Sequence, residues 1–336
     1  MATIKDIANE AGVSVSTVSH VVNQTRFVSP AKTASVKAAI DKLGYTPSYL
    51  AKALKGNKTS TIGMLVTSST NPFFAEVVSG VEEGSFEEGY SLILGNAGES
   101  SKRQIDYLNI LVEKQIDGLI VMTTSRDRKF VNQLNKLSHL PKVVLDSESI
   151  SNGCAIGDDS FSGAKTAVEH LIKCGHSDIA FITGPTSHDR SDKRLMGAKS
   201  ALEEAGLVLN DDFVREGSLD IPSGYKAAVD LLRTSKKPTA IFAFNDLMAL
   251  GSYKALEKLN LSVPNDVSII GYDNIEMSEY LTPGLTTVHQ PGREIGRSTA
   301  LMLIENLKHG KKLPSSFVFN PELVIRESVQ SLHKED

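Results

Sequence analysis

The stretch AGVSVSTVSHVVNQTRF, from Ala11 to Phe27, decides how the N-terminal part of the chain folds. Val13 to Ser16 alternate valine with serine, which is typical of a β-strand. The segment just before it, TIKDIANEAG, carries apolar residues at helical spacing, so a second helix set against a first is the alternative. A strand here would have no hairpin partner and no turn residues to support it. We therefore predict a helix from Val15 to about Asn23.

Several local signals support this helix. Ser14 stands at the N-cap position, where its hydroxyl can accept from the free amides of the first turn. Val15, Val18 and Val22 recur at the spacing of one helix face. Gly12 lies between the two helices, where a tight turn needs a residue that tolerates positive φ. Two short helices joined in this way predict a helix-turn-helix, whose second helix enters the major groove of DNA.

The second helix also carries the side chains that we expect to contact DNA. Val15, Ser16 and His20 are predicted to face outward, toward base edges. Phosphate contacts are assigned to four polar residues, Thr17, Ser19, Asn23 and Arg26. We also place Thr3 among the DNA-contacting residues. A third helix, PAKTASVKAAIDKLG, is expected to close a small core with Val36, Ala39, Ile40 and Leu43. A three-helix interaction module without DNA is the alternative.

The charge of the chain is distributed unevenly. Its 336 residues predict two or three domains, and 40% apolar with 23% charged residues is ordinary for a soluble globular protein. The net charge is −4, yet the first 60 residues hold eight basic and three acidic side chains. The remainder holds 28 basic and 37 acidic side chains. A small basic head on an acidic body indicates a polyanionic partner for the head.

The composition also argues against several classes of protein. No apolar run approaches the length of a membrane span, and the N-terminus lacks the pattern of a signal peptide. The two cysteines, Cys154 and Cys174, form neither a metal-ligand spacing nor a disulfide framework, which fits a reducing cytoplasm. No catalytic constellation stands out. We expect a cytoplasmic protein without enzymatic activity, metal or cofactor.

The segment YTPSYLAKALKGNKTS follows the head. Residues 48–55 are good helix formers, but a helix this short is not stable without a partner. Leu54 is flanked by Lys52 and Lys55. This composition is typical of an apolar side chain that inserts into the DNA minor groove while neighbouring lysines contact phosphates. A plain linker is the alternative.

From Thr61 onward, short apolar runs alternate with amphipathic stretches. Alternating strands and helices predict parallel sheets with helices on both faces. The order indicates two doubly wound halves, one beginning at Thr61 and the other at Asp178. Ligands on such sheets bind outside the carboxyl ends of the strands.

The residues that follow these strands form a coherent set. They combine two aromatic rings with amides, carboxylates and a guanidinium: Asn71, Phe73, Phe74, Asp146, Arg194, Asn245, Asp273 and Gln290. Aromatic rings stack on the apolar faces of sugars, and planar polar groups bind hydroxyls. Taken singly, each residue has a structural alternative as a helix cap, a core residue or a surface ion pair. Their convergence at strand ends predicts a small-sugar site.

The motif TIKDIANEAGVSVSTVSHVVN, together with STNPFF, FNDLMALG, IIGYDN and LTTVHQP, resembles the lactose/galactose repressor family over nearly the whole chain. Within the family the sequence looks closest to ribose operon repressors, with the purine repressor next. The resemblance implies a homodimer on a near-palindromic operator, with Leu54 inserted into a central base step. It also implies an α/β core like that of periplasmic binding proteins, in which three crossovers join two subdomains.

The resemblance implies a division of the chain. The expected parts are a helix-turn-helix domain (1–46), a hinge helix and linker (47–60), an N-subdomain (61–161 and 291–320) and a C-subdomain (162–290 and 321–336). The crossovers are expected near Ser160–Ser162, Gln290–Gly292 and Asn320–Glu322.

The family's ligand contacts map onto the same eight residues, which implies ribose or a related monosaccharide that releases the repressor from DNA. Two features depart from the ribose pattern: Ser147 follows Asp146, and the loop before Arg194 reads SHDRSDK. A purine-responsive repressor is the alternative within the family. A solute-binding transport protein and an enzyme on the same fold are the alternatives outside it.

Overall fold

A computed structural model describes residues 2–23, 25–45, 58–98, 100–122, 127–145, 154–186 and 188–333. The chain divides into two compact units, Met1–Thr59 and Ser60–Asp336, and each is described by itself. The expected hinge helix, with Leu54 and Lys55, lies outside the described residues. So does Asp146.

The first unit contains the predicted helices α1 (Ile4–Glu10), α2 (Val15–Asn23) and α3 (Pro30–Leu43). The expected N-cap is present, because Ser14 Oγ accepts from the Thr17 amide at 3.2 Å. Gly12 has φ +64° between α1 and α2. The three helices enclose a small core of Ile7, Ala8, Val18, Val36 and Ala39. The helical interpretation of the opening stretch is therefore confirmed.

One detail of α2 differs from the prediction. Val15 is 41% exposed, whereas Val21 and Val22 pack with the buried Val18 against the small core. At 100° per residue, Val15 lies only about 20° around the helix axis from Val22, so its angle does not explain its exposure. Val15 is the first residue of α2, and its side chain belongs to the outer surface at that end of the helix.

The second unit begins with a six-stranded sheet in the order β11-β5-β4-β3-β1-β2. All neighbouring strands in it run parallel. Its strands are β1 (Thr61–Val66), β2 (Ser91–Asn96), β3 (Gly118–Met122), β4 (Lys142–Leu145), β5 (Cys154–Asp158) and β11 (Ser316–Phe319).

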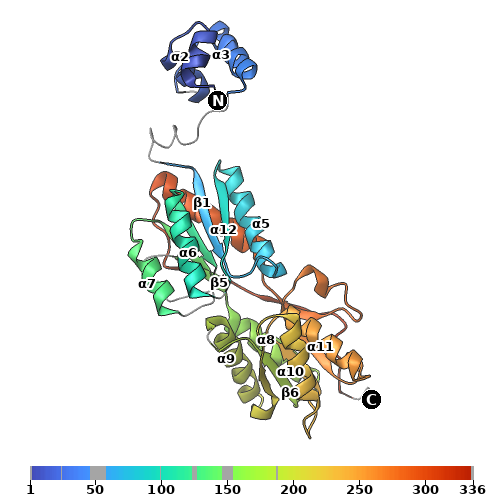
Figure 1. The fold of residues 1–336 in the computed structure, drawn as a ribbon. Coiled ribbons are helices and arrows are strands. Elements are labelled where there is room, and N and C mark those ends of the chain that lie inside the picture. Colours follow the sequence, from blue (N-terminus) through green and yellow to red (C-terminus); the bar gives the residue numbers. More distant parts are fainter. Residues whose placement is uncertain are drawn as a thin grey trace. The chain divides into compact units, whose positions relative to one another are not determined.

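Helices cover both faces of this first sheet (Figure 1). Ile62 and Met64 of β1 pack into one core with α5 (Pro72–Glu87) and α12 (Gly292–His309). Leu65 belongs to the other core, with α6 (Ser101–Glu113) and α7 (Arg128–Lys136). Successive side chains of a strand point to opposite faces, which explains why the predicted runs are apolar throughout.

A second six-stranded sheet has the order β12-β10-β9-β8-β6-β7, with β12 antiparallel to β10 and the other pairs parallel. Its strands are β6 (Ile179–Thr183), β7 (Val214–Glu216), β8 (Ala240–Ala243), β9 (Ser268–Asp273), β10 (Thr286–His289) and β12 (Glu322–Val324). The helices packed on it are α8 (Ser160–Lys173), α9 (Asp189–Glu204), α10 (Ile221–Leu232) and α11 (Asp246–Lys258). Short 3₁₀ turns lie at η1 (Asp211–Phe213) and η2 (Glu276–Ser278).

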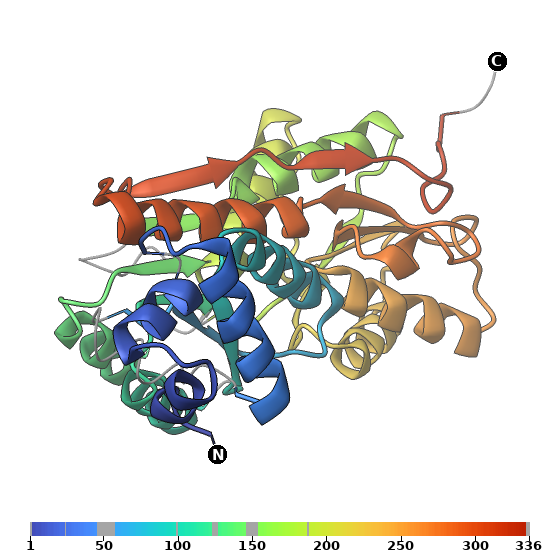
Figure 2. The same ribbon diagram turned by 90° about the horizontal axis from the view of Figure 1, so that it is seen from above.

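The chain passes between the two sheets after β5, after β10 and after β11. β11 and β12 follow one another along the same side of the unit, each at the edge of its own sheet (Figure 2). Both sheets are doubly wound, as predicted. Each is therefore able to present the carboxyl ends of its strands to a shared cleft.

Candidate functional site

A cleft between the two sheets brings the expected ligand residues together. It is lined by Asn71, Phe73, Phe74, His188, Arg190, Ser191, Arg194, Leu219, Asn245, Asp273 and Gln290. Seven of the eight expected ligand residues are in this set, and the eighth, Asp146, is not described. The free volume of the cleft is about 40 Å³. Sites for small ligands usually hold at least about 300 Å³, so a ligand requires the cleft to widen.

The first sheet contributes the aromatic wall of the cleft. Asn71 is the N-cap of α5, and its Oδ1 accepts from the Phe73 amide at 3.0 Å. Phe73 is 7% exposed, and its ring centroid lies 5.9 Å from that of Phe74 at an angle of 57°. Asn71 and Phe73 therefore have the structural roles of cap and core residue as well as facing the cleft.

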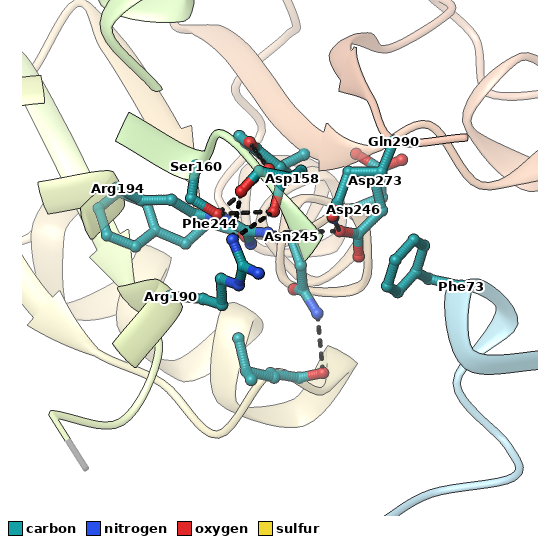
Figure 3. Close-up of polar contacts among 12 residues, drawn as sticks. Phe73, Asp158, Ser160, Arg190, Arg194, Phe244, Asn245, Asp246, Asp273 and Gln290 are labelled. Carbon is teal, nitrogen blue, oxygen red and sulfur yellow. Dashed lines mark hydrogen bonds and ion pairs between the residues drawn. The ribbon is translucent and has the colours of Figure 1, made fainter. Parts of the chain in front are cut away.

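Arg194 is the central cation of the opposite wall (Figure 3). It is 7% exposed, with its guanidinium 3.6 Å from the centroid of the Tyr272 ring. One terminal nitrogen donates to the Phe244 carbonyl, and the other lies 3.9 Å from Asp273 Oδ1. Its buried Nε has no hydrogen-bond partner among the described residues. Arg194 is thus fixed in orientation, with one buried donor left unpaired among the described residues.

Asp273 and Gln290 form a buried polar pair beside this guanidinium. Gln290 Nε2 donates to Asp273 Oδ1 at 2.7 Å. Burial raises the pKa of the Asp273 carboxyl well above its ordinary value, and the neighbouring Arg194 opposes this shift. The pair presents a carboxylate and an amide to any ligand that enters the cleft.

Asn245 closes this wall at the start of α11. Its Oδ1 accepts from the Met248 amide at 2.9 Å, and its Nδ2 donates to the Leu219 carbonyl at 3.0 Å. One amide proton and one lone pair of Asn245 remain for a ligand. The next residue, Asp246, is fully buried, and burial raises the pKa of its carboxyl to about 7.

Sequence reasoning missed four residues of the cleft: His188, Arg190, Ser191 and Leu219. The first three belong to the charged segment SHDRSDK, so a signal for them was present in the sequence; the expected loop is wrong from Asp189 onward, where the chain forms the start of α9. A second pocket of about 570 Å³ adjoins the cleft and shares Phe73, Asp273 and Gln290 with it.

On the head, the expected DNA-contacting residues lie at or near the surface. Val15, Ser16 and Asn23 are exposed, as are Thr3 and Arg26. The other three, Thr17, Ser19 and His20, are half-buried. His20 Nδ1 lies 2.8 Å from Thr25 Oγ1, and Asn23 Nδ2 donates to the Ser19 carbonyl at 2.9 Å. Their roles in DNA binding stay predictions.

Known protein families cover both units. Residues 3–48 match the family of bacterial regulatory proteins, lacI family. Residues 59–324 match the periplasmic binding proteins and sugar binding domain of the LacI family. The chain belongs to the LacI family. The family resemblance expected from the sequence is therefore confirmed.

Individual LacI-family proteins match along the whole chain. The HTH-type transcriptional repressor PurR of Vibrio campbellii is 44% identical over 334 residues, or 99% of this chain and 100% of that protein. PurR of Vibrio cholerae is 42% identical over 335 residues, with the same coverage. The Lac repressor dimer bound to operator and the anti-inducer ONPF has a TM-score of 0.90 at 29% identity, covering 98% of this chain and 99% of that one.

A LacI-family regulator from Enterococcus faecium with bound ribose has a TM-score of 0.73 at 33% identity. It matches 81% of this chain and 100% of that chain. This LacI-family chain is a DNA-binding transcriptional repressor with a ligand-binding core, and it is not an enzyme. No helix in the described part of the chain is long and apolar enough to cross a membrane.

Proposed function

We propose that this repressor responds to a purine base bound in the cleft between its two sheets. The observation that carries the proposal is the 44% identity to PurR repressors, which extends over both the head and the core. This alternative replaces ribose as the first candidate. In this proposal the protein acts in the cytoplasm as a homodimer on a near-palindromic operator, and the Lac repressor dimer on operator supports that arrangement.

The lining of the cleft is chemically suited to a purine. A purine is flat and aromatic, so one of the two phenylalanine rings can stack on its face. The edges of a purine carry both donors and acceptors. Arg194 Nε offers a donor, and the Asp273 carboxyl and the Gln290 amide offer complementary groups.

The proposed assignment of residues keeps the expected boundaries and sites. The head, 1–46, binds DNA through α2, and residues 47–60 join it to the core. The effector lies between the N-subdomain (61–161 and 291–320) and the C-subdomain (162–290 and 321–336). Asp146 remains in the proposed ligand set on the strength of the resemblance.

Ribose is the second candidate, because a LacI-family regulator with bound ribose is 33% identical to this chain. The same amides and carboxylate can bind sugar hydroxyls, and a phenylalanine can stack on the apolar face of the ring. If ribose is the effector, we predict that its binding releases the repressor from the operator.

A thermal-shift titration of the full chain separates the two candidates. Adenine, guanine, hypoxanthine, ribose and glucose are compared at matched concentrations. A ligand at 100 times its dissociation constant stabilises the folded core by about 2.7 kcal/mol. We expect a purine to stabilise the core and ribose to have no effect. Stabilisation by ribose alone would refute the purine proposal.

A matched variant ties the ligand to the cleft. Asp273→Ala should abolish the ligand-induced shift while leaving operator affinity in the absence of ligand unchanged. Because coupling is reciprocal, the factor by which the ligand alters operator affinity must equal the factor by which operator alters ligand affinity. Titrations of the wild type in both directions measure the two factors. A ligand response retained by Asp273→Ala would place the effector elsewhere.

A further inference from the structure

Arg190 forms an ion pair that joins the two halves of the core. It lies at the start of α9, which packs on the second sheet, yet its guanidinium reaches Asp158 at the end of β5 in the first sheet (Figure 3). Arg190 Nη1 lies 3.0 Å from Asp158 Oδ1 and also donates to the Asp158 carbonyl. The Asp158 side chain is fully buried, and that of Arg190 is 15% exposed.

The surroundings of Asp158 hold this ion pair in place. Ser160 Oγ donates to the Asp158 carboxylate at 2.9 and 3.1 Å, and the Tyr272 hydroxyl donates to Oδ2. Gly157 provides the space for the guanidinium, because a Cβ at that position would overlap Arg190 Nη2. If Arg190 moved away, a buried carboxylate would lose a cation that compensates it, which is strongly unfavourable.

The same Arg190 side chain lines the cleft, whose free volume is only about 40 Å³. A ligand can widen the cleft by separating the two walls or by moving side chains. Phe73 and Arg194 are both buried, and the described part of the chain holds Arg190 by an ion pair that reaches from one sheet to the other. A ligand therefore has to fit beside Arg190 and cannot displace it at low cost.

We propose that Arg190, anchored by Asp158, sets the upper size limit of the effector. The cleft accepts a single ring system, such as a free purine base or a monosaccharide, and rejects the nucleoside that joins the two. This inference rests on the proposed function, since it requires that the effector binds in this cleft. It also gives a role to the charged segment at the start of α9 that departs from the ribose pattern.

The test measures binding of hypoxanthine, ribose and inosine to the full chain by isothermal titration calorimetry. Inosine consists of hypoxanthine and ribose joined by a glycosidic bond, so the size comparison applies whichever fragment is bound. The variants are Asp158→Asn, Arg190→Ala/Asp158→Asn and Arg190→Met/Asp158→Asn. Asparagine retains hydrogen bonds to Ser160 and Tyr272 without a buried charge. Methionine retains most of the length of the arginine side chain without the guanidinium.

Wild type should bind one fragment and not inosine. The alanine variant should bind inosine at least about tenfold more tightly than wild type does, and it should gain more affinity for inosine than for the fragment. The methionine variant should still reject inosine, because its side chain still fills the space. Arg233→Ala, on the exposed C-cap of α10, is the matched control and should behave as wild type.

Each other outcome decides against a stated claim. Inosine binding by wild type, or by the methionine variant as tightly as by the alanine variant, would overturn the size limit but leave the proposed function standing. An alanine variant that binds the fragment and still rejects inosine would do the same. If wild type binds neither hypoxanthine nor ribose, these two effectors and the size limit drawn from them both fail.

Discussion

Arg326 anchors Asn274, the residue after Asp273 of the cleft, with Nη2 donating to Asn274 Oδ1 at 2.8 Å. Asn274 has φ +56°, and the preceding Asp273 has φ +114°. Both values are uncommon for residues with a Cβ, and such conformations persist where surrounding contacts enforce them. The hydrogen bond therefore helps to hold the backbone that orients the Asp273 carboxylate.

The positive φ of Asn274 predicts different effects for two substitutions of this residue. Glycine and alanine both remove the contact with Arg326, but only alanine is strained at positive φ. The free energy of unfolding of Asn274→Ala should be about 1 kcal/mol lower than that of Asn274→Gly. Denaturant titration measures the difference. Equal stability of the two variants would show that the backbone conformation contributes nothing.

The stability of the core should depend on pH through Asp246. Burial raises the pKa of this carboxyl to about 7, whereas it is about 3.9 in an unfolded chain. Between these values the folded state holds a proton that the unfolded state has lost. The contribution of Asp246 is thus fully present below about pH 4 and is lost as pH rises through about 7, with a slope of at most about 1.4 kcal/mol per pH unit.

Asp246→Asn isolates this effect, since asparagine can keep hydrogen bonds to Thr287 and the Ile275 amide. The unfolding free energy of wild type should fall relative to that of the variant between pH 5 and pH 7.5. Denaturant titrations at each pH provide the comparison. A constant difference across this range would contradict the buried, proton-binding state of Asp246.

Helices α5 and α12 pack with their backbones in close contact, which depends on glycine. A Cβ at position 296 would overlap the carbonyl oxygen of Val77. Gly296→Ala should therefore destabilise the core by about 1–3 kcal/mol or more, because neither backbone can move freely in a packed interior. Ser298 lies on the same helix and is half-exposed, so Ser298→Ala should have little effect. Thermal unfolding of the two variants makes the comparison.

The outer face of α2 should determine which operator is bound. Exchange of Val15, Ser16 and His20 should change the preferred sequence, because each good base contact contributes about 1–3 kcal/mol of discrimination. The cleft belongs to the other compact unit, so ligand affinity should not change. Selection from a pool of random DNA sites measures the preference. An unaltered preference in the triple variant would refute the assignment.

The helix-turn-helix was predictable because its signals are local. The Ser14 cap and the positive φ of Gly12 depend on a few neighbouring residues, and so does the apolar face around Val18. The alternation of strands and helices was also visible, because strands buried on both faces read as short apolar runs. The short β5 ends in Gly157 and Asp158 and has no such run, so its sequence does not predict a strand.

The sequence alone therefore determined the helix-turn-helix and the α/β class of the core, and it suggested which residues follow the strands. Only the tertiary structure decided how those residues meet. Arg190 is 32 residues from Asp158 in the chain, and Tyr272 is 114 residues from it, yet both contact Asp158. Local propensity carries no information about such pairs, because their contacts depend on how two separately built sheets pack against one another.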